Sequence, residues 1–101
     1  MSLKKQYLKT KTVCKVTFTV PSAVAGVAKQ INLVGEFNNW DTQSLPMKKL
    51  KNGDFSVSLE LERLKEYQFK YLIDGKEWLN DLEADKLVQN KFQGENSVVI
   101  V

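Results

Sequence analysis

The sequence predicts an all-β domain, a sandwich of about seven short antiparallel strands. Apolar residues recur at every second position, and no stretch shows the 3.6-residue apolar spacing of an amphipathic helix. Turn-forming residues separate these stretches at intervals of about 8–12 residues, as in sandwiches and small barrels. The chain has 101 residues, close to the usual size of an immunoglobulin-type sandwich. We therefore expect an immunoglobulin-like sandwich, with a small barrel as the alternative.

The first predicted strand covers residues 14–20, where the even positions are apolar and the odd positions are polar. This alternation places Cys14 on the buried face of the strand. A free cysteine in such a position is core filler far more often than a nucleophile. Pro21 ends the strand, the small residues 22–28 form a connection, and a second strand is expected over residues 31–35.

A long polar loop over residues 36–46 precedes a predicted hairpin. Its strands are expected over residues 47–50 and 55–61, because the dipeptide Asn52-Gly53 between them accepts the positive φ angles of a tight turn. In the second of these strands the odd positions are apolar and face the core. The even positions are polar and face water.

The C-terminal third begins with a strand over residues 67–73, whose odd positions are apolar and whose position 70 faces outward. Asp74-Gly75 predicts the next turn. Residues 79–86 are acidic and irregular, with at most a short helical turn. Residues 97–101 form a last strand, whose nearly continuous apolar run indicates burial on both faces.

Residues 13–101 are predicted to form one domain, since no repeat, low-complexity stretch or linker divides them. Residues 1–12 are basic, and we interpret them as a flexible, solvated N-terminal arm. No apolar run with the length of a signal peptide or a membrane span follows this arm. We therefore expect a cytoplasmic protein that does not contact a membrane.

The composition restricts the chemistry that the chain can perform. It has no His and one Cys, which excludes imidazole acid/base catalysis and zinc sites built from several Cys or His ligands. We expect neither a cofactor nor a metal. Glycoside hydrolysis needs two carboxyl groups at a defined separation, one of them with a raised pKa. The carboxylates of residues 36–41 and 81–85 lie in polar loops instead, so the chain is predicted not to be an enzyme.

The loop over residues 35–41 contains a large aromatic side chain and two amides, where a purely structural loop more often carries small turn residues. A pyranose ring has a flat C–H face and a rim of hydroxyls. Trp40 offers a platform for that face, and Asn38 or Asn39 offers donors and acceptors for the rim. The alternative is that Trp40 closes one end of the sandwich.

The formal net charge of +3 leaves a second kind of ligand open, because the basic arm and exposed aromatics would also suit single-stranded nucleic acid. Such binding depends steeply on salt, whereas binding of a neutral sugar does not. The charge excess is small and lies largely in the arm. We therefore expect no nucleic-acid partner.

Several short motifs occur in a characteristic order along the chain: Val34 to Asp41, Pro46-Met47, Asn52-Gly53, Tyr67 to Tyr71, Ile73-Asp74-Gly75, Trp78 and Glu95-Asn96-Ser97. This order resembles that of carbohydrate-binding module family 48. This family includes the early-set domain that precedes isoamylase and branching-enzyme barrels, and the glycogen-binding domain in the β subunit of AMP-activated protein kinase. The chain is similar, more closely still, to short bacterial proteins that consist of this domain alone.

The resemblance implies roles for individual residues. In glycogen-binding members, two tryptophans stack on glucose rings while a lysine and a late asparagine hydrogen-bond the hydroxyls. By position these roles fall on Trp40 and Trp78 for stacking, and on Lys70 and Asn96 for hydrogen bonding. Phe92 stands where some members have an aliphatic residue that pushes through the curve of a cyclic glucan.

The function that the resemblance implies is non-catalytic binding of α-glucan, such as glycogen, starch or a maltooligosaccharide. Its alternative is a module that docks on a glucan-metabolising enzyme with little or no sugar binding. Two residues separate Gly75 from Trp78 where the kinase-type domains have one, so the face that Trp78 takes depends on whether the turn absorbs the extra residue. A hydroxyl residue and a second asparagine of glycogen binders are missing from residues 94–97, which predicts a weaker or differently tuned site.

Overall fold

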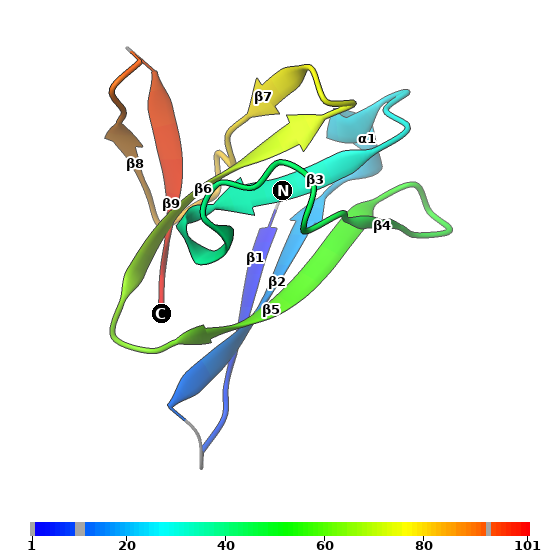
Figure 1. Ribbon diagram of the computed structural model, residues 1–101. Coiled ribbons are helices and arrows are strands. Elements are labelled where there is room, and N and C mark those ends of the chain that lie inside the picture. Colours follow the sequence, from blue (N-terminus) through cyan, green and yellow to red (C-terminus); the bar gives the residue numbers. More distant parts are fainter. Residues whose placement is uncertain (1, 10–11, 93) are drawn as a thin grey trace.

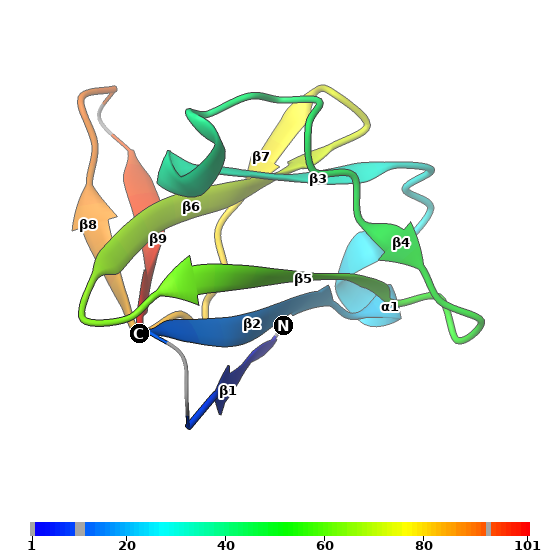
Figure 2. The ribbon, with the colours of Figure 1, turned by 60° about the horizontal axis from the view of Figure 1, so that its bottom comes forward.

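The computed structural model describes residues 2–9, 12–92 and 94–101 and shows a two-layer β-sandwich (Figures 1 and 2). The predicted all-β class is confirmed, because the two short helices, α1 (Ser22–Ala25) and the 3-10 turn η1 (Glu36–Asn38), cover only seven residues. No helix among the described residues has the length and apolar character of a membrane span. The strands are β1 (Ser2–Tyr7), β2 (Val13–Val20), β3 (Ile31–Gly35), β4 (Lys48–Lys49), β5 (Phe55–Glu62), β6 (Glu66–Ile73), β7 (Glu77–Leu79), β8 (Lys86–Gln89) and β9 (Glu95–Ile100).

The strands form two antiparallel sheets, as expected for an immunoglobulin-like sandwich. One sheet has the order β1-β2-β5-β4, and the other has the order β3-β6-β9-β8, with β7 pairing to the end of β6. The apolar positions of the alternating strands meet between the sheets. Phe18 of β2 packs edge-to-face on Phe69 of β6, with ring centroids 5.1 Å apart. Cys14 is fully buried in this core, as its place in the alternation predicts.

The prediction of a flexible arm over residues 1–12 is wrong for residues 2–7, which form the edge strand β1. This strand pairs with the whole of β2, from Ser2 opposite Thr19 to Tyr7 opposite Cys14. Leu3 packs against the core, and the Lys5 Nζ lies 2.7 Å from the Asp85 Oδ2, in the loop just before β8. Basic side chains do not prevent strand formation at a sheet edge, where lysine is common and stays solvated. Residues 1, 10 and 11 of the predicted arm lie outside the described residues.

Two further strands, β7 and β8, lie in the region that the sequence marks as a turn followed by an irregular acidic stretch. They have three and four residues, too few to show a period-two pattern. Similarly, α1 occupies part of the predicted connection over residues 22–28. The irregular stretch is thus confined to residues 80–85, between β7 and β8.

A buried carboxylate anchors the 80–85 loop to the core. Asp81 is fully buried, and its Oδ2 accepts a hydrogen bond of 2.9 Å from the Tyr71 hydroxyl. Its Oδ1 accepts another, also 2.9 Å, from the backbone N–H of Glu83. Burial, together with the nearby charge and hydrogen bond of Asp81, raises the pKa of Tyr71 far above its ordinary value.

This raised pKa predicts a loss of stability in alkaline solution. Above pH of about 10 the unfolded chain loses the Tyr71 proton while the folded protein keeps it, so the free energy of unfolding falls as pH rises, by about 1.4 kcal/mol per pH unit. Urea unfolding followed by circular dichroism between pH 9 and 11 measures this slope. Tyr71→Phe should make this slope shallower by about 1.4 kcal/mol per pH unit, because the titrating hydroxyl is gone. An unchanged slope in that variant would contradict the raised pKa of Tyr71.

Candidate functional site

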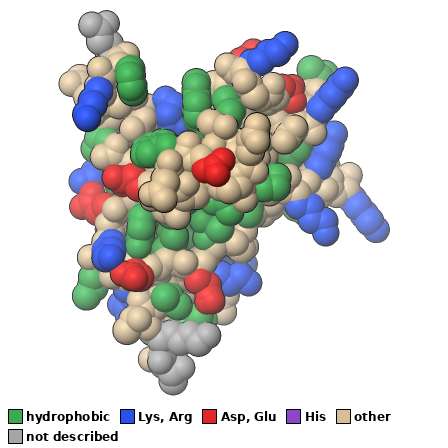
Figure 3. All heavy atoms as spheres, viewed as in Figure 1, with side chains coloured by type: hydrophobic (Ala, Val, Ile, Leu, Met, Phe, Trp, Pro, Cys, Tyr) green, Lys and Arg blue, Asp and Glu red, His purple; other side chains and the backbone are tan. Residues whose placement is uncertain are grey.

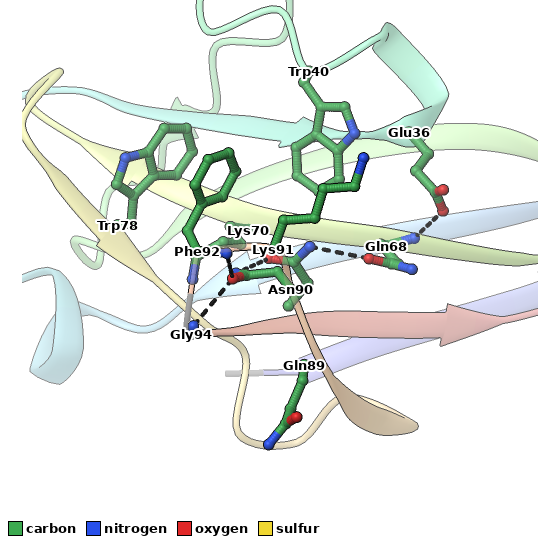
Figure 4. Close-up of a pocket in the computed structure, with 11 residues that line it drawn as sticks. Glu36, Trp40, Gln68, Lys70, Trp78, Gln89, Asn90, Lys91, Phe92 and Gly94 are labelled. Carbon is green, nitrogen blue, oxygen red and sulfur yellow. Dashed lines mark hydrogen bonds between the residues drawn. The ribbon is translucent and has the colours of Figure 1, made fainter.

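The outer face of the second sheet carries a groove with a volume of about 1150 Å³ (Figure 4). Its floor is β6, because the even-numbered residues of this strand alternate away from the core. Its walls come from the loop after β3, from β7 and from the connection between β8 and β9. The lining residues are Glu36, Trp40, Gln68, Lys70, Trp78, Gln89, Asn90, Lys91, Phe92, Gly94 and Asn96.

Strand register explains why Trp78 faces the groove. In an antiparallel pair, directly opposite residues share a face of the sheet, and Trp78 lies opposite Leu72. Leu72 and Lys70 are two residues apart on β6 and therefore also share a face. The turn absorbs the extra residue, since Asp74 and Gly75 both adopt positive φ angles of 50° and 67° in a three-residue loop. Trp78 is half exposed, with 50% of its surface accessible.

Trp40 is held over the groove by a tight turn. Its backbone N–H donates a 2.8 Å hydrogen bond to the carbonyl of Gly35, at the end of β3. Asn39 and Trp40 have φ angles of 57° and 59°, a left-handed conformation that costs energy for residues with a Cβ. Such strain persists where surrounding contacts hold it and is common at functional sites. Trp40 is 39% exposed, so it does not simply plug the end of the sandwich.

Asn38 supplies the contacts that hold this turn. Its Oδ1 accepts a 3.0 Å hydrogen bond from the N–H of Gly35, and its Nδ2 donates to the Ser44 Oγ at 2.9 Å and to the Asp41 carbonyl at 3.1 Å. The amide of Asn38 is therefore occupied by the loop itself. Nearby, the Glu36 Oε1 accepts a 2.6 Å hydrogen bond from the N–H of Gln68, which ties the loop to β6.

Three aromatic side chains lie together in the groove. In Figure 4 the ring of Phe92 lies between the indoles of Trp40 and Trp78. Phe92 is 89% exposed, which is unusual for a phenylalanine side chain. Side by side, the three rings offer apolar faces on which flat ligand surfaces can stack.

Several polar groups of the groove take part in two separate sets of hydrogen bonds. The Lys70 Nζ donates to the Glu95 carbonyl at 2.8 Å, and the Asn80 Nδ2 donates to the same oxygen at 2.8 Å. Asn96 is only 8% exposed, and its Nδ2 donates to the Gln68 Oε1 at 3.0 Å. These contacts restrict the positions of the Lys70, Asn96 and Gln68 side chains.

Most of the residues singled out from the sequence meet in this groove: Trp40, Lys70, Trp78, Phe92 and Asn96. Asn39 does not line it, because Asn39 forms the left-handed corner of the loop, where its backbone N–H bonds to the Glu36 carbonyl. Groove residues that the sequence did not single out are Glu36, Gln68, Gln89, Asn90, Lys91 and Gly94. The alternation along the strand could have identified Gln68, because Gln68 lies two residues from Lys70 and therefore faces outward with it.

The described residues hold no group of three or more His, Cys, Asp or Glu side chains that could share a metal ion. On the face shown in Figure 3, acidic and basic side chains are interspersed, and hydrophobic side chains reach the surface between them. The groove itself combines aromatic rings with amides, two lysines and the carboxylate of Glu36.

Comparison with known proteins gives one family. The family model for the glycogen recognition site of AMP-activated protein kinase matches residues 23–101. The matched range includes every residue that lines the groove. A search of curated proteins gives no match. Because the match spans most of the chain, the protein belongs to this glycogen-recognition family of non-catalytic carbohydrate-binding modules.

Proposed function

We propose that the protein binds α-glucan chains, such as glycogen, starch or maltooligosaccharides, by stacking glucose rings on Trp40, Trp78 and Phe92. The observation that carries this proposal is the convergence of these three exposed rings in one groove with Lys70. Membership of a family described as a glycogen recognition site supports the choice of α-glucan over other sugars.

The physical fit lies in the two surfaces of a glucose unit. Its C–H faces are apolar and stack on aromatic rings, which removes apolar area of both partners from water. Its hydroxyls lie at the ring edge, where Lys70 retains N–H groups beyond the one given to the Glu95 carbonyl. With a few stacking contacts and a small number of exposed hydrogen bonds, the dissociation constant should be on the order of 0.1 mM.

The second candidate is a module that docks on a glucan-metabolising enzyme. Phe92, at 89% exposure, and Trp78, at 50%, are the observations that favour it, because exposed aromatic groups on one surface are also typical of protein interfaces. Sugar binding would then be weak or absent. A direct binding measurement separates the two candidates.

Calorimetric titration of the folded protein with maltoheptaose and β-cyclodextrin, at low and high salt, tests the proposal. We expect saturable binding that changes little with salt, since the ligand is uncharged, and no binding of cellohexaose at the same concentrations. Trp40→Ala should weaken maltoheptaose binding by at least about tenfold, because it removes one stacking platform.

Leu82→Ala is the matched control for this variant. Leu82 is 80% exposed but does not line the groove, so its loss should leave the affinity unchanged. If the folded wild type binds neither sugar, the docking module becomes the better description. If binding weakens steeply with added salt, the ligand is instead a polyanion.

A further inference from the structure

The side chain of Asn90 makes three hydrogen bonds in the connection between β8 and β9, which forms one wall of the groove (Figure 4). Its Oδ1 accepts the backbone N–H groups of Phe92, at 2.8 Å, and Gly94, at 3.0 Å. Its Nδ2 donates to the Asn96 Oδ1 at 3.1 Å. One amide therefore contacts both the backbone that carries the Phe92 ring and the side chain of Asn96.

The oxygen of this amide fixes the backbone at Phe92. An asparagine oxygen that accepts the N–H two residues further on is a common way of stabilising a tight turn. The turn is also closed by the Asn90 N–H, which donates to the Gly94 carbonyl at 2.9 Å. Gly94 leaves room for the amide, because a Cβ at Gly94 would lie 3.4 Å from the Asn90 Nδ2. Since the Phe92 side chain is 89% exposed and buries little area, the position of Phe92 depends chiefly on the bonds to Asn90.

The nitrogen of the same amide orients Asn96. A main-chain N–H can only donate, so the Asn90 atom that faces Phe92 and Gly94 is the oxygen, and the nitrogen faces Asn96. Asn96 must then present its oxygen to Asn90, while its Nδ2 donates one N–H to the Gln68 Oε1 at 3.0 Å. Within the described part of the chain, no other bond uses the second N–H of this nitrogen. Asn96 lines the groove and thus keeps one N–H for a ligand, in an orientation that Asn90 sets.

We propose that Asn90 is a positioning residue for two ligand contacts, the ring of Phe92 through the turn and the amide of Asn96 through a direct hydrogen bond. This inference rests on the proposed glucan binding, in which Phe92 stacks on a glucose ring and Asn96 bonds to a hydroxyl. Because one side chain anchors both groups, they are held in a fixed relation before the ligand arrives. Groups that are ordered in advance lose little freedom on binding, which strengthens it.

Asn90→Asp separates the two roles of this side chain. Aspartate keeps the oxygen that accepts from the turn, but it replaces the donor to Asn96 with a second acceptor, so the Asn96 amide should turn over. We expect maltoheptaose binding about fivefold weaker than in the wild type, the worth of one hydrogen bond. If Asn90 acts on this contact only through Asn96, adding Asn90→Asp to Asn96→Ala should change the affinity by less than about twofold.

Asn90→Ser is the uncharged counterpart, because serine offers a weaker acceptor to the turn and ends short of Asn96. It should lose about the same factor as Asn90→Asp. Asn52→Ser is the matched control. The Asn52 Oδ1 likewise accepts an N–H two residues further on, from Asp54 at 3.0 Å, but Asn52 does not line the groove. Its replacement should leave the affinity unchanged.

Asn90→Ala removes both roles and should weaken binding by about 25-fold, since the Phe92 ring also loses its fixed place. In the Phe92→Ala background, Asn90→Ala should cost only the fivefold that belongs to Asn96. Titration followed by NMR measures these affinities. Amide hydrogen exchange in the same samples should show the N–H groups of Phe92 and Gly94 protected in the wild type and in Asn90→Asp, and unprotected in Asn90→Ala.

The outcomes separate this inference from the proposed function. If the wild type binds maltoheptaose and Asn90→Asp and Asn90→Ser bind equally well, Asn90 does not position Asn96 and the inference fails alone. If the losses from Asn90→Asp and Asn96→Ala multiply, to about 25-fold in the double variant, Asn90 acts on the ligand by another route and the positioning role is overturned. If the folded wild type binds no α-glucan, the proposed function fails, and the role of Asn90 with it.

Discussion

Replacing Asp81 with alanine is expected to lower the free energy of unfolding by about 3 kcal/mol, since one buried donor and one partly buried donor would lose their acceptor, the buried one at about 1–3 kcal/mol. These donors are the Tyr71 hydroxyl and the N–H of Glu83. The removed carboxylate no longer has to be kept out of water, which offsets part of the loss. Urea unfolding followed by circular dichroism measures the difference.

Asp81→Asn is the matched control, because it keeps the shape and one acceptor oxygen and should cost less than Asp81→Ala. The structural disturbance caused by Asp81→Ala should also reach the groove. The Asp81 N–H donates to the Ser97 Oγ, which donates to Asn80, and Asn80 shares the Glu95 carbonyl with Lys70. If Asp81→Ala and the surface variant Glu60→Ala had the same midpoint of urea unfolding, this account would be contradicted.

Gly35→Ala is expected to cost a similar amount, about 3 kcal/mol, through overpacking between β3 and β6. A Cβ at this position would lie 2.7 Å from the carbonyl oxygen of Gln68 and 2.9 Å from the Cβ of Phe69. Backbone and Cβ atoms cannot swing aside as a flexible side chain does, so the strands must separate. Gly35 has an extended φ of −169°, so the cost comes from the close approach and not from backbone strain.

Gly75→Ala separates these two causes. Gly75 has a φ of 67° and open space around it, so alanine there meets only the left-handed penalty, about 1 kcal/mol. Gly35→Ala should therefore be clearly the more destabilising of the pair in thermal or urea unfolding. It should also weaken glucan binding, because the Gly35 carbonyl anchors the N–H of Trp40. Equal stability of Gly35→Ala and wild type would mean that β3 and β6 separate at no cost.

Strict alternation predicted the long strands well. The strands expected over residues 14–20 and 55–61 correspond to β2 (Val13–Val20) and β5 (Phe55–Glu62). Alternation is informative there because one face of each strand packs on the core and the other meets water. It failed at β1, where the sequence SLKKQY puts little apolar surface on either face and stability comes from pairing with β2 and from the Lys5–Asp85 ion pair.

The residues of the candidate site were predictable in part, and its geometry was not. Family resemblance pointed to Trp40, Trp78, Lys70, Asn96 and Phe92, and all of them line one groove. The orientation of Trp78 depends on the φ angles of the three turn residues between β6 and β7. The spacing of residues in the sequence does not determine these angles. The hydrogen bonds from Asn90 to Asn96 and from Asn96 to Gln68 join residues up to 28 positions apart, and only the folded register of β6 and β9 brings them together.

The placement of both tryptophans in the groove has a spectroscopic consequence. The chain has two tryptophans, and neither lies in the core. Intrinsic indole emission therefore reports on the groove alone, and acrylamide should quench it in the native protein until a ligand covers the rings. For the same reason this emission is a poor monitor of unfolding, because the indoles already meet water in the folded state.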